Sequence, residues 1–182
     1  GMDNTGLFYE IPCPDKTSRR LEREIRQVVR KSSDKKSRFF GRVSPYVGRA
    51  EPKVVEALAE SAEKLGVPAK VGLTVSCSGF FAPQGRNIAR IKPGPPDLDH
   101  ILSEYNPGIP GQRIENMEME SSFLNHFLGG LGYWSGSICA TIAHRREESF
   151  KPEYREIVRN GVRVALAALA SLRASYPDEI VI

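Results

Sequence analysis

The segment Val71-Gly72-Leu73-Thr74-Val75-Ser76 decides the fold class of this chain. It is short, largely apolar and rich in β-branched residues, which is typical of a strand buried on both faces of a sheet. A second segment of the same kind, Ser-Ile-Cys-Ala-Thr-Ile-Ala, occupies residues 137–143. The sequence therefore predicts two buried strands that are far apart along the chain.

Helix patterns surround both predicted strands. Pro52 suits the first turn of a helix whose apolar residues recur at helical spacing, and Gly66 suits its end. Further helices are predicted over residues 97–105, 117–131 and 152–174. The alternation of strands with helices of this length predicts an α/β domain, in which helices flank a mixed central sheet.

The number of predicted strands is small for such a sheet. Residues 5–11 and 179–182 are the remaining candidates for strands, and both segments are short. No internal repeat explains the shortage. We therefore expect a single domain over residues 1–182 that lacks strands on its amino-terminal side.

The composition excludes several classes of protein. A chain of 182 residues with 40% apolar and 26% charged residues is typical of a globular domain. No stretch approaches the roughly 18 apolar residues that span a membrane, and residues 1–6 do not begin a signal peptide. Cys13, Cys77 and Cys139 lie far apart without a CxxC pair, which argues against a disulfide framework and a zinc site. We expect a cytoplasmic protein without a membrane partner or a metal.

Basic residues are concentrated between residues 19 and 42 of a chain with a formal net charge of +4. Acidic residues are interspersed among them, and Leu21, Ile25 and Val29 mark one apolar helix face. Clustered cations could bind nucleic acid, but no recognition motif occurs elsewhere in the sequence. We therefore favour a solvated amphipathic helix over a nucleic-acid-binding module.

A segment with ligand-binding character follows the first predicted strand. It contains the adjacent aromatic residues Phe80 and Phe81, followed by Gln84 and Arg86. A flat base could stack on an aromatic ring, while the amide and the guanidinium group reach a ring edge with two carbonyls and an N–H. The alternative is a structural turn with one phenylalanine in the core and the arginine in solvent.

A second segment, Asn-Met-Glu-Met-Glu-Ser-Ser at residues 116–122, opens the predicted helix over residues 117–131. Phe123, Phe127 and Leu131 follow the spacing of a core-facing stripe. Glu118 and Glu120 are two residues apart and cannot face each other on a helix, which argues against a glycosidase-type carboxylate pair. Either they interact with the helix macrodipole, or one of them binds hydroxyl groups.

Together the two segments resemble the nucleoside phosphorylase family, in particular its uridine phosphorylase branch. Residues 80–86 are similar to the FYxxQxR stretch that binds uracil in that branch, and residues 118–121 are similar to its EMES stretch that binds ribose. Residues 2–9 are similar to a segment from the middle of the family's domain, and the resemblance extends to about residue 174. It implies a phosphorylase/hydrolase-like fold.

The resemblance implies how the base would be held. Arg86 and Gln84 would hydrogen-bond the uracil edge, and Arg86 would stabilise the negative charge that develops on the base, so these two residues are the catalytic candidates. Phe80 would stack on the base. Ile142 would line the base pocket. The purine-specific branch carries an aspartate near this position, whereas residues 142–145 contain none, and Arg145 fits the pyrimidine branch.

The resemblance also implies how the sugar would be held. Met119 would pack under the ribose, and Glu120 would accept hydrogen bonds from its hydroxyl groups. Glu118 would be a second acceptor. These contacts would position the sugar for an oxocarbenium-like transition state.

The function implied by the resemblance is phosphorolysis of uridine to uracil and ribose 1-phosphate by a homo-oligomeric enzyme of pyrimidine salvage, with phosphate as co-substrate and no metal or organic cofactor. The family's phosphate-binding segments are not recognisable in this chain and would precede Met2. We therefore expect no efficient phosphorolysis by this polypeptide alone. The alternatives are a non-catalytic pyrimidine-binding or assembly remnant, a related nucleosidase and a basic nucleic-acid-binding module.

Overall fold

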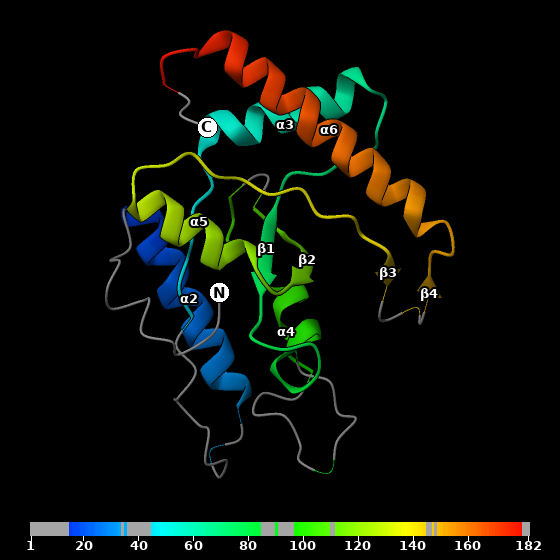
Figure 1. Cartoon of the computed structure of the whole chain (residues 1–182). Helices are drawn as coiled ribbons and strands as arrows, with labels where there is room; N and C mark the ends of the chain where they lie inside the picture. Colours follow the sequence, from blue (N-terminus) through cyan, green and yellow to red (C-terminus); the bar gives the residue numbers. More distant parts are fainter. Residues whose placement is uncertain are drawn as a thin grey trace. The chain divides into compact units, whose positions relative to one another are not determined.

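The computed structural model describes residues 15–33, 35, 45–84, 90, 97–109, 112–144, 147 and 149–179. The chain divides into two compact units, whose elements are labelled in Figure 1. The first unit contains residues 1–49 and 72–133, and the second contains residues 50–71 and 134–182. Each unit has helices and a small sheet, so the architecture is α/β.

The first unit is built around two parallel strands that lie side by side (Figure 1). Its elements are α2 (Lys16–Ser32), β1 (Leu73–Ser76), the 3-10 turn η1 (Ala82–Gln84), α4 (Leu98–Glu104), β2 (Ile114–Glu118) and α5 (Ser121–Gly130). Val75 and Cys77 pack with Val29 of α2 and with Leu98 and Leu102 of α4. This apolar cluster holds α2 and α4 against the two strands.

The second unit is a helix pair with a short hairpin. Its elements are α3 (Pro52–Lys64), β3 (Ala143–His144), β4 (Ser149–Phe150) and α6 (Tyr154–Ser175), and Figure 1 shows α3 and α6 packed side by side. Ala57 of α3 packs with Ala168 and Leu172 of α6. None of the helices described in either unit is both long enough and apolar enough to cross a membrane.

Most helix predictions are confirmed. The helix from Pro52 is α3, and Gly66 behind it has a φ of 63°, a left-handed conformation that glycine adopts without steric cost. The helices predicted over residues 97–105 and 152–174 are α4 and α6, with ends shifted by one or two residues. The basic amphipathic helix is α2, and its predicted apolar residues Leu21 and Val29 are buried.

The predicted buried strand over residues 137–143 is wrong for most of its length. Only Ala143–His144 forms a strand, and both of its residues are exposed. Ile138 is 36% exposed. An apolar β-branched run becomes a buried strand only where neighbouring strands accept and donate its backbone hydrogen bonds, and the described residues place no strand beside residues 137–141. Of the other candidates, residues 5–11 and 180–182 lie outside the described residues.

The helix predicted over residues 117–131 is wrong in its first part. Residues 114–118 form β2, which pairs with β1, and α5 begins only at Ser121. Phe123, Phe127 and Leu131 are exposed, whereas the buried residues of α5 are Ser121, Ser122, Asn125 and His126. The predicted core-facing stripe is therefore on the outside of α5.

The polar face of α5 is buried because Ser76 and the backbone of Gly48 approach that face closely. The backbone N–H of Ser122 donates to Ser76 Oγ at 2.9 Å. A Cβ atom on Gly48 would collide with the Ser122 carbonyl oxygen and would lie 3.0 Å from the His126 backbone nitrogen. Hydrogen bonding and this close approach leave no room for the phenylalanine rings on that side.

Two leucines of α6 provide a matched test of the second unit's core. Leu172 is 7% exposed and contacts the cluster with Ala57, whereas Leu169, three residues earlier, is 45% exposed. We expect Leu172→Ala to lower the free energy of unfolding by about 2–4 kcal/mol through the lost contacts and the cavity left behind. Leu169→Ala should change it by less than about 0.5 kcal/mol. Denaturant unfolding checks this, and equal effects of the two substitutions would contradict the described packing.

Candidate functional site

The candidate site lies at the edge of the sheet where β1 and β2 both end. Ser76 is the register partner of Glu118, and the Cys77 backbone N–H donates to the Glu118 carbonyl oxygen at 2.9 Å. The segment with the phenylalanines follows β1, and the segment with the acidic residues follows β2. Parallel pairing thus brings both predicted segments to one sheet edge, at the carboxyl ends of the strands, where α/β proteins bind ligands.

The turn after β1 separates its aromatic residues from its amide. Phe80 and Phe81 are each 51% exposed, and their ring centres are 5.2 Å apart in an edge-to-face arrangement. The alternative that one of them lies in the core is therefore wrong. Gln84 is 1% exposed, and its backbone N–H donates to the Phe81 carbonyl oxygen at 3.0 Å. The two rings thus face solvent, whereas the amide side chain is enclosed.

The end of β2 is fixed by the side chain of Glu118. Its Oε1 accepts a hydrogen bond from the Ser76 hydroxyl group, and its Oε2 accepts from the backbone N–H groups of Glu120 and Ser121, both at 2.7 Å. These N–H groups belong to the start of α5 and have no partner within the helix. The explanation of Glu118 as an electrostatic partner of a helix amino terminus is therefore confirmed.

Hydrogen bonding sets the charge of Glu118. Burial alone would raise the pKa of its carboxyl group, but hydrogen bonds from Ser76, Glu120 and Ser121 stabilise the charged form and outweigh this effect. The pKa of Glu118 therefore lies below its ordinary value. The side chain carries a negative charge at neutral pH.

Glu120 behaves differently although it is only two residues away. It occupies the N-cap position of α5, yet its side chain makes no capping hydrogen bond, and it is exposed together with Met119. A carboxylate held in solvent beside an exposed thioether can accept hydrogen bonds from a bound polyol. The sequence left both glutamates as candidates for interaction with the helix and for hydroxyl binding, with Glu120 as the first acceptor and Glu118 as the second. The structure gives the capping bonds to Glu118 and leaves the Glu120 side chain exposed.

Sequence reasoning missed three residues that brace this edge. Ser76 bridges Glu118 and the Ser122 backbone N–H, and Tyr46 Oη lies 3.3 Å from Ser122 Oγ. His126 is buried with its ring centre 5.1 Å from that of Tyr46. The alternation within β1, which turns the apolar side chain of Val75 to one face and the polar side chains of Thr74 and Ser76 to the other, was the pattern that could have identified Ser76.

The structure of the first unit does not place the remaining predicted site residues. Arg86 and Arg145 lie outside the described residues. Ile142 belongs to the second unit, where it is half-buried and its carbonyl oxygen accepts from the Lys151 backbone N–H at 2.9 Å. His144 Nδ1 accepts from the Glu147 backbone N–H at 3.3 Å.

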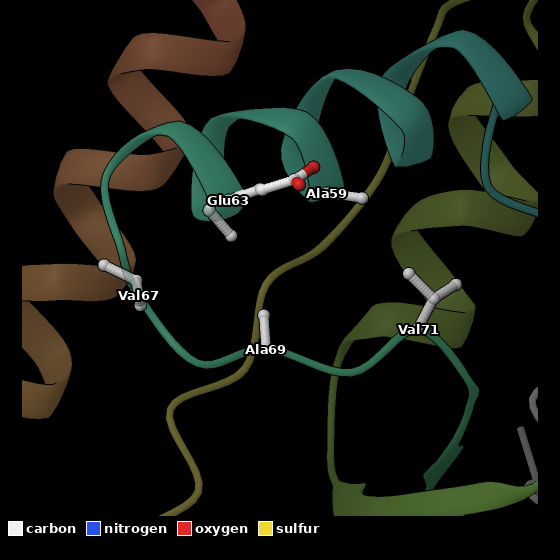
Figure 2. A pocket seen from close by; sticks show the side chains of 6 residues that line it. Ala59, Glu63, Val67, Ala69 and Val71 are labelled. Carbon is white, nitrogen blue, oxygen red and sulfur yellow. The ribbon is translucent and has the colours of Figure 1, made fainter.

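Two hollows occur elsewhere. One of about 140 Å³ lies in the second unit between α3 and the segment after it, where Figure 2 shows alkyl side chains and the carboxylate of Glu63. The other, of about 490 Å³, is lined by residues of α2 and by Lys35. Neither hollow is lined by the residues at the sheet edge. Within the described part of the chain, no group of three or more His, Cys, Asp or Glu residues is arranged to hold a metal.

The chain is similar to one curated protein named as a uridine phosphorylase, from Thermococcus kodakarensis. The two sequences are 30% identical over 109 residues, which are 58% of this chain and 36% of that protein. The matched part thus spans about a third of the relative's length. No family model and no solved structure matches. The match supports a relationship to nucleoside phosphorylases.

The lowered pKa of Glu118 predicts a pH-dependent contribution to stability. A carboxyl group whose pKa is lower in the folded state stabilises that state above its ordinary pKa, and the stabilisation is lost as the pH falls through the folded pKa. We expect Glu118→Gln to lower the free energy of unfolding at pH 7 and the difference from the wild type to shrink as the pH falls below about 4.5. Denaturant unfolding between pH 7 and pH 3 measures both.

Glu120→Gln is the matched control for this titration. Its side chain makes no capping bond, so this substitution should change the free energy of unfolding by less than about 0.5 kcal/mol at pH 7. If the free energies of unfolding of the wild type and Glu118→Gln differ by a constant amount across the pH range, the described hydrogen bonds are contradicted.

Proposed function

We propose that this chain is a uridine phosphorylase-like protein that binds a pyrimidine nucleoside at the sheet edge where β1 and β2 end. The observation that carries the proposal is the pairing of Ser76 with Glu118, because it brings the base-binding and sugar-binding segments to one place. The similarity to a named uridine phosphorylase supports the same assignment. A single domain with a phosphorylase/hydrolase-like fold is part of this proposal.

The base is proposed to bind on the side of the turn after β1. Phe80 stacks on the ring from its exposed position, and Arg86 and Gln84 hydrogen-bond the polar edge. Because Gln84 is enclosed in the described structure, nucleoside binding must rearrange the turn around it. Ile142 and Arg145 are candidates for further base contacts on the resemblance alone.

The sugar is proposed to bind on the side of α5. The exposed side chain of Met119 packs against the ribose, and the exposed carboxylate of Glu120 accepts hydrogen bonds from its hydroxyl groups. The negative charge of a carboxylate strengthens such bonds relative to those of a neutral acceptor.

The proposed reaction is the attack of a phosphate oxygen on the C1′ atom of uridine. The C1′–N1 bond breaks as the new C1′–O bond forms, its electron pair leaves with the uracil, and the products are uracil and ribose 1-phosphate. Arg86 stabilises the developing negative charge on the base, and neither a metal nor an organic cofactor takes part. Phosphate is the co-substrate, and its binding residues are not recognisable in this sequence.

A non-catalytic pyrimidine-binding protein is the second candidate. In both cases we propose a homo-oligomer, since the exposed Phe123 and Phe127 of α5 and Leu131 at its C-cap are apolar side chains of the kind that protein partners cover.

Nucleoside binding and uracil release test the two candidates. We expect isothermal calorimetry to detect binding of uridine and of uracil by this chain. Uracil release from uridine that requires phosphate favours the phosphorylase reaction, whereas binding without release favours the non-catalytic candidate. Rapid release that requires phosphate would show that the phosphate site is present. Binding of neither compound would overturn the proposed function.

Variants separate the base and sugar contacts. Glu120→Ala should weaken uridine binding about tenfold and leave uracil binding unchanged, because uracil has no hydroxyl groups to bind. Arg86→Lys keeps the charge but loses the planar donor fork, so it should weaken the binding of both uridine and uracil. Normal binding of both ligands by Arg86→Lys would remove that residue from the site.

A further inference from the structure

The capping network at the end of β2 has a function beyond stability. We propose that Glu118 and Ser76 are positioning residues that fix the backbone carrying Met119 and Glu120, and that Glu118 is not an acceptor for the sugar hydroxyl groups. This inference rests on the proposed function, since it concerns how the same nucleoside site is held in shape.

The carboxylate of Glu118 is occupied on both oxygens. Oε1 accepts from the Ser76 hydroxyl group, and Oε2 accepts two backbone N–H groups at 2.7 Å. A carboxylate has about four acceptor positions, and the Ser121 side chain also donates a hydrogen bond to this one. The side chain is directed into the turn between β2 and α5, so little of its capacity faces outward.

Ser76 completes the network from the neighbouring strand. Its hydroxyl group donates to Glu118 and accepts the Ser122 backbone N–H at 2.9 Å. Two side chains thus bind three consecutive N–H groups, those of residues 120, 121 and 122. The first turn of α5 is held directly above the strand ends.

Met119 and Glu120 lie between these fixed points. The Glu120 backbone N–H is bound by Glu118, while its carboxylate stays exposed. Ser76 is also the last residue of β1, from which the proposed base-binding turn begins. The same two side chains therefore set the distance between the base and sugar contacts, and a precise distance is what positioning a nucleoside for reaction requires.

The positioning role predicts that Ser76 and Glu118 affect uridine binding as one unit. Glu118→Gln retains the size but offers one acceptor oxygen, and Ser76→Ala removes the bridging hydroxyl group. Each should weaken uridine binding about tenfold in calorimetry. The double variant should be no weaker than the worse single variant, because both changes release the same turn. Additive losses would overturn the proposal.

The Glu120→Ala background separates positioning from direct contact. If Glu118 acts by holding Glu120, then Glu118→Gln and Ser76→Ala should each weaken uridine binding by less than about twofold once the Glu120 carboxylate is absent. If Glu118 itself accepts a hydrogen bond from a sugar hydroxyl group, Glu118→Gln should still weaken uridine binding about tenfold in that background. Ser76→Ala should then have little effect on uridine binding in any background. That second pattern would refute the positioning role.

Thr74→Val is the matched control for disturbance of the strand pair. Thr74 Oγ1 lies 2.7 Å from Asn116 Oδ1, so this substitution removes a side-chain bond between the same two strands without touching the turn. Uridine affinity should stay within about twofold of the wild type. A tenfold loss in Thr74→Val would show that general loosening of the strands explains the other variants, and the proposal would fail.

Amide hydrogen exchange keeps this inference separable from the proposed function. Without ligand, exchange at the N–H groups of residues 120–122 should accelerate about tenfold in Ser76→Ala and Glu118→Gln but not in Thr74→Val. If the wild type binds no uridine but exchange at these N–H groups accelerates in Ser76→Ala and Glu118→Gln, the proposed function fails while the described network stands. If the amides do not respond, the positioning role is refuted whatever the protein binds.

Discussion

The candidate site depends on the contact between Ser76 and Glu118 at the ends of two parallel strands. The register of β1 and β2 places the two residues opposite each other, and their side chains bind the first turn of α5. A charged acceptor at a helix amino terminus both satisfies unpaired N–H groups and interacts favourably with the helix dipole. The pairing of the two strands therefore fixes both the start of α5 and the backbone of the exposed Glu120.

The orientation of α5 follows from that contact. Since its first turn is bound to Ser76 and Glu118, the helix must place Ser122 and His126 against the strands and the Gly48 backbone. Its phenylalanines then have no interior to enter, and Phe123 and Phe127 stack on each other outside with ring centres 5.7 Å apart. The polar network and the exposed apolar surface thus have the same physical origin.

The resemblance to uridine phosphorylases and the fold of the first unit point to one place. The resemblance joins residues 80–86 with residues 118–121 as parts of one nucleoside site, and β1 and β2 place both segments at a common edge. The named relative is matched over 36% of its length. The hydrogen bonds distinguish the two glutamates, because the carboxylate of Glu118 is bound within the turn whereas the side chain of Glu120 makes no capping bond.

Elements with local causes could be predicted from the amino-acid sequence. Pro52 and Gly66 delimited α3, helical spacing located α4 and α6, and the β-branched run located β1. Three features depend instead on contacts between distant residues: residues 114–118 form a strand, residues 137–141 do not, and Glu118 and Glu120 differ in their hydrogen bonds. Parallel pairing joins residues 42 positions apart, such as Thr74 and Asn116, and such non-local hydrogen bonds leave no periodic pattern in the intervening sequence. Whether an apolar run becomes a strand depends on a partner that its own residues do not specify.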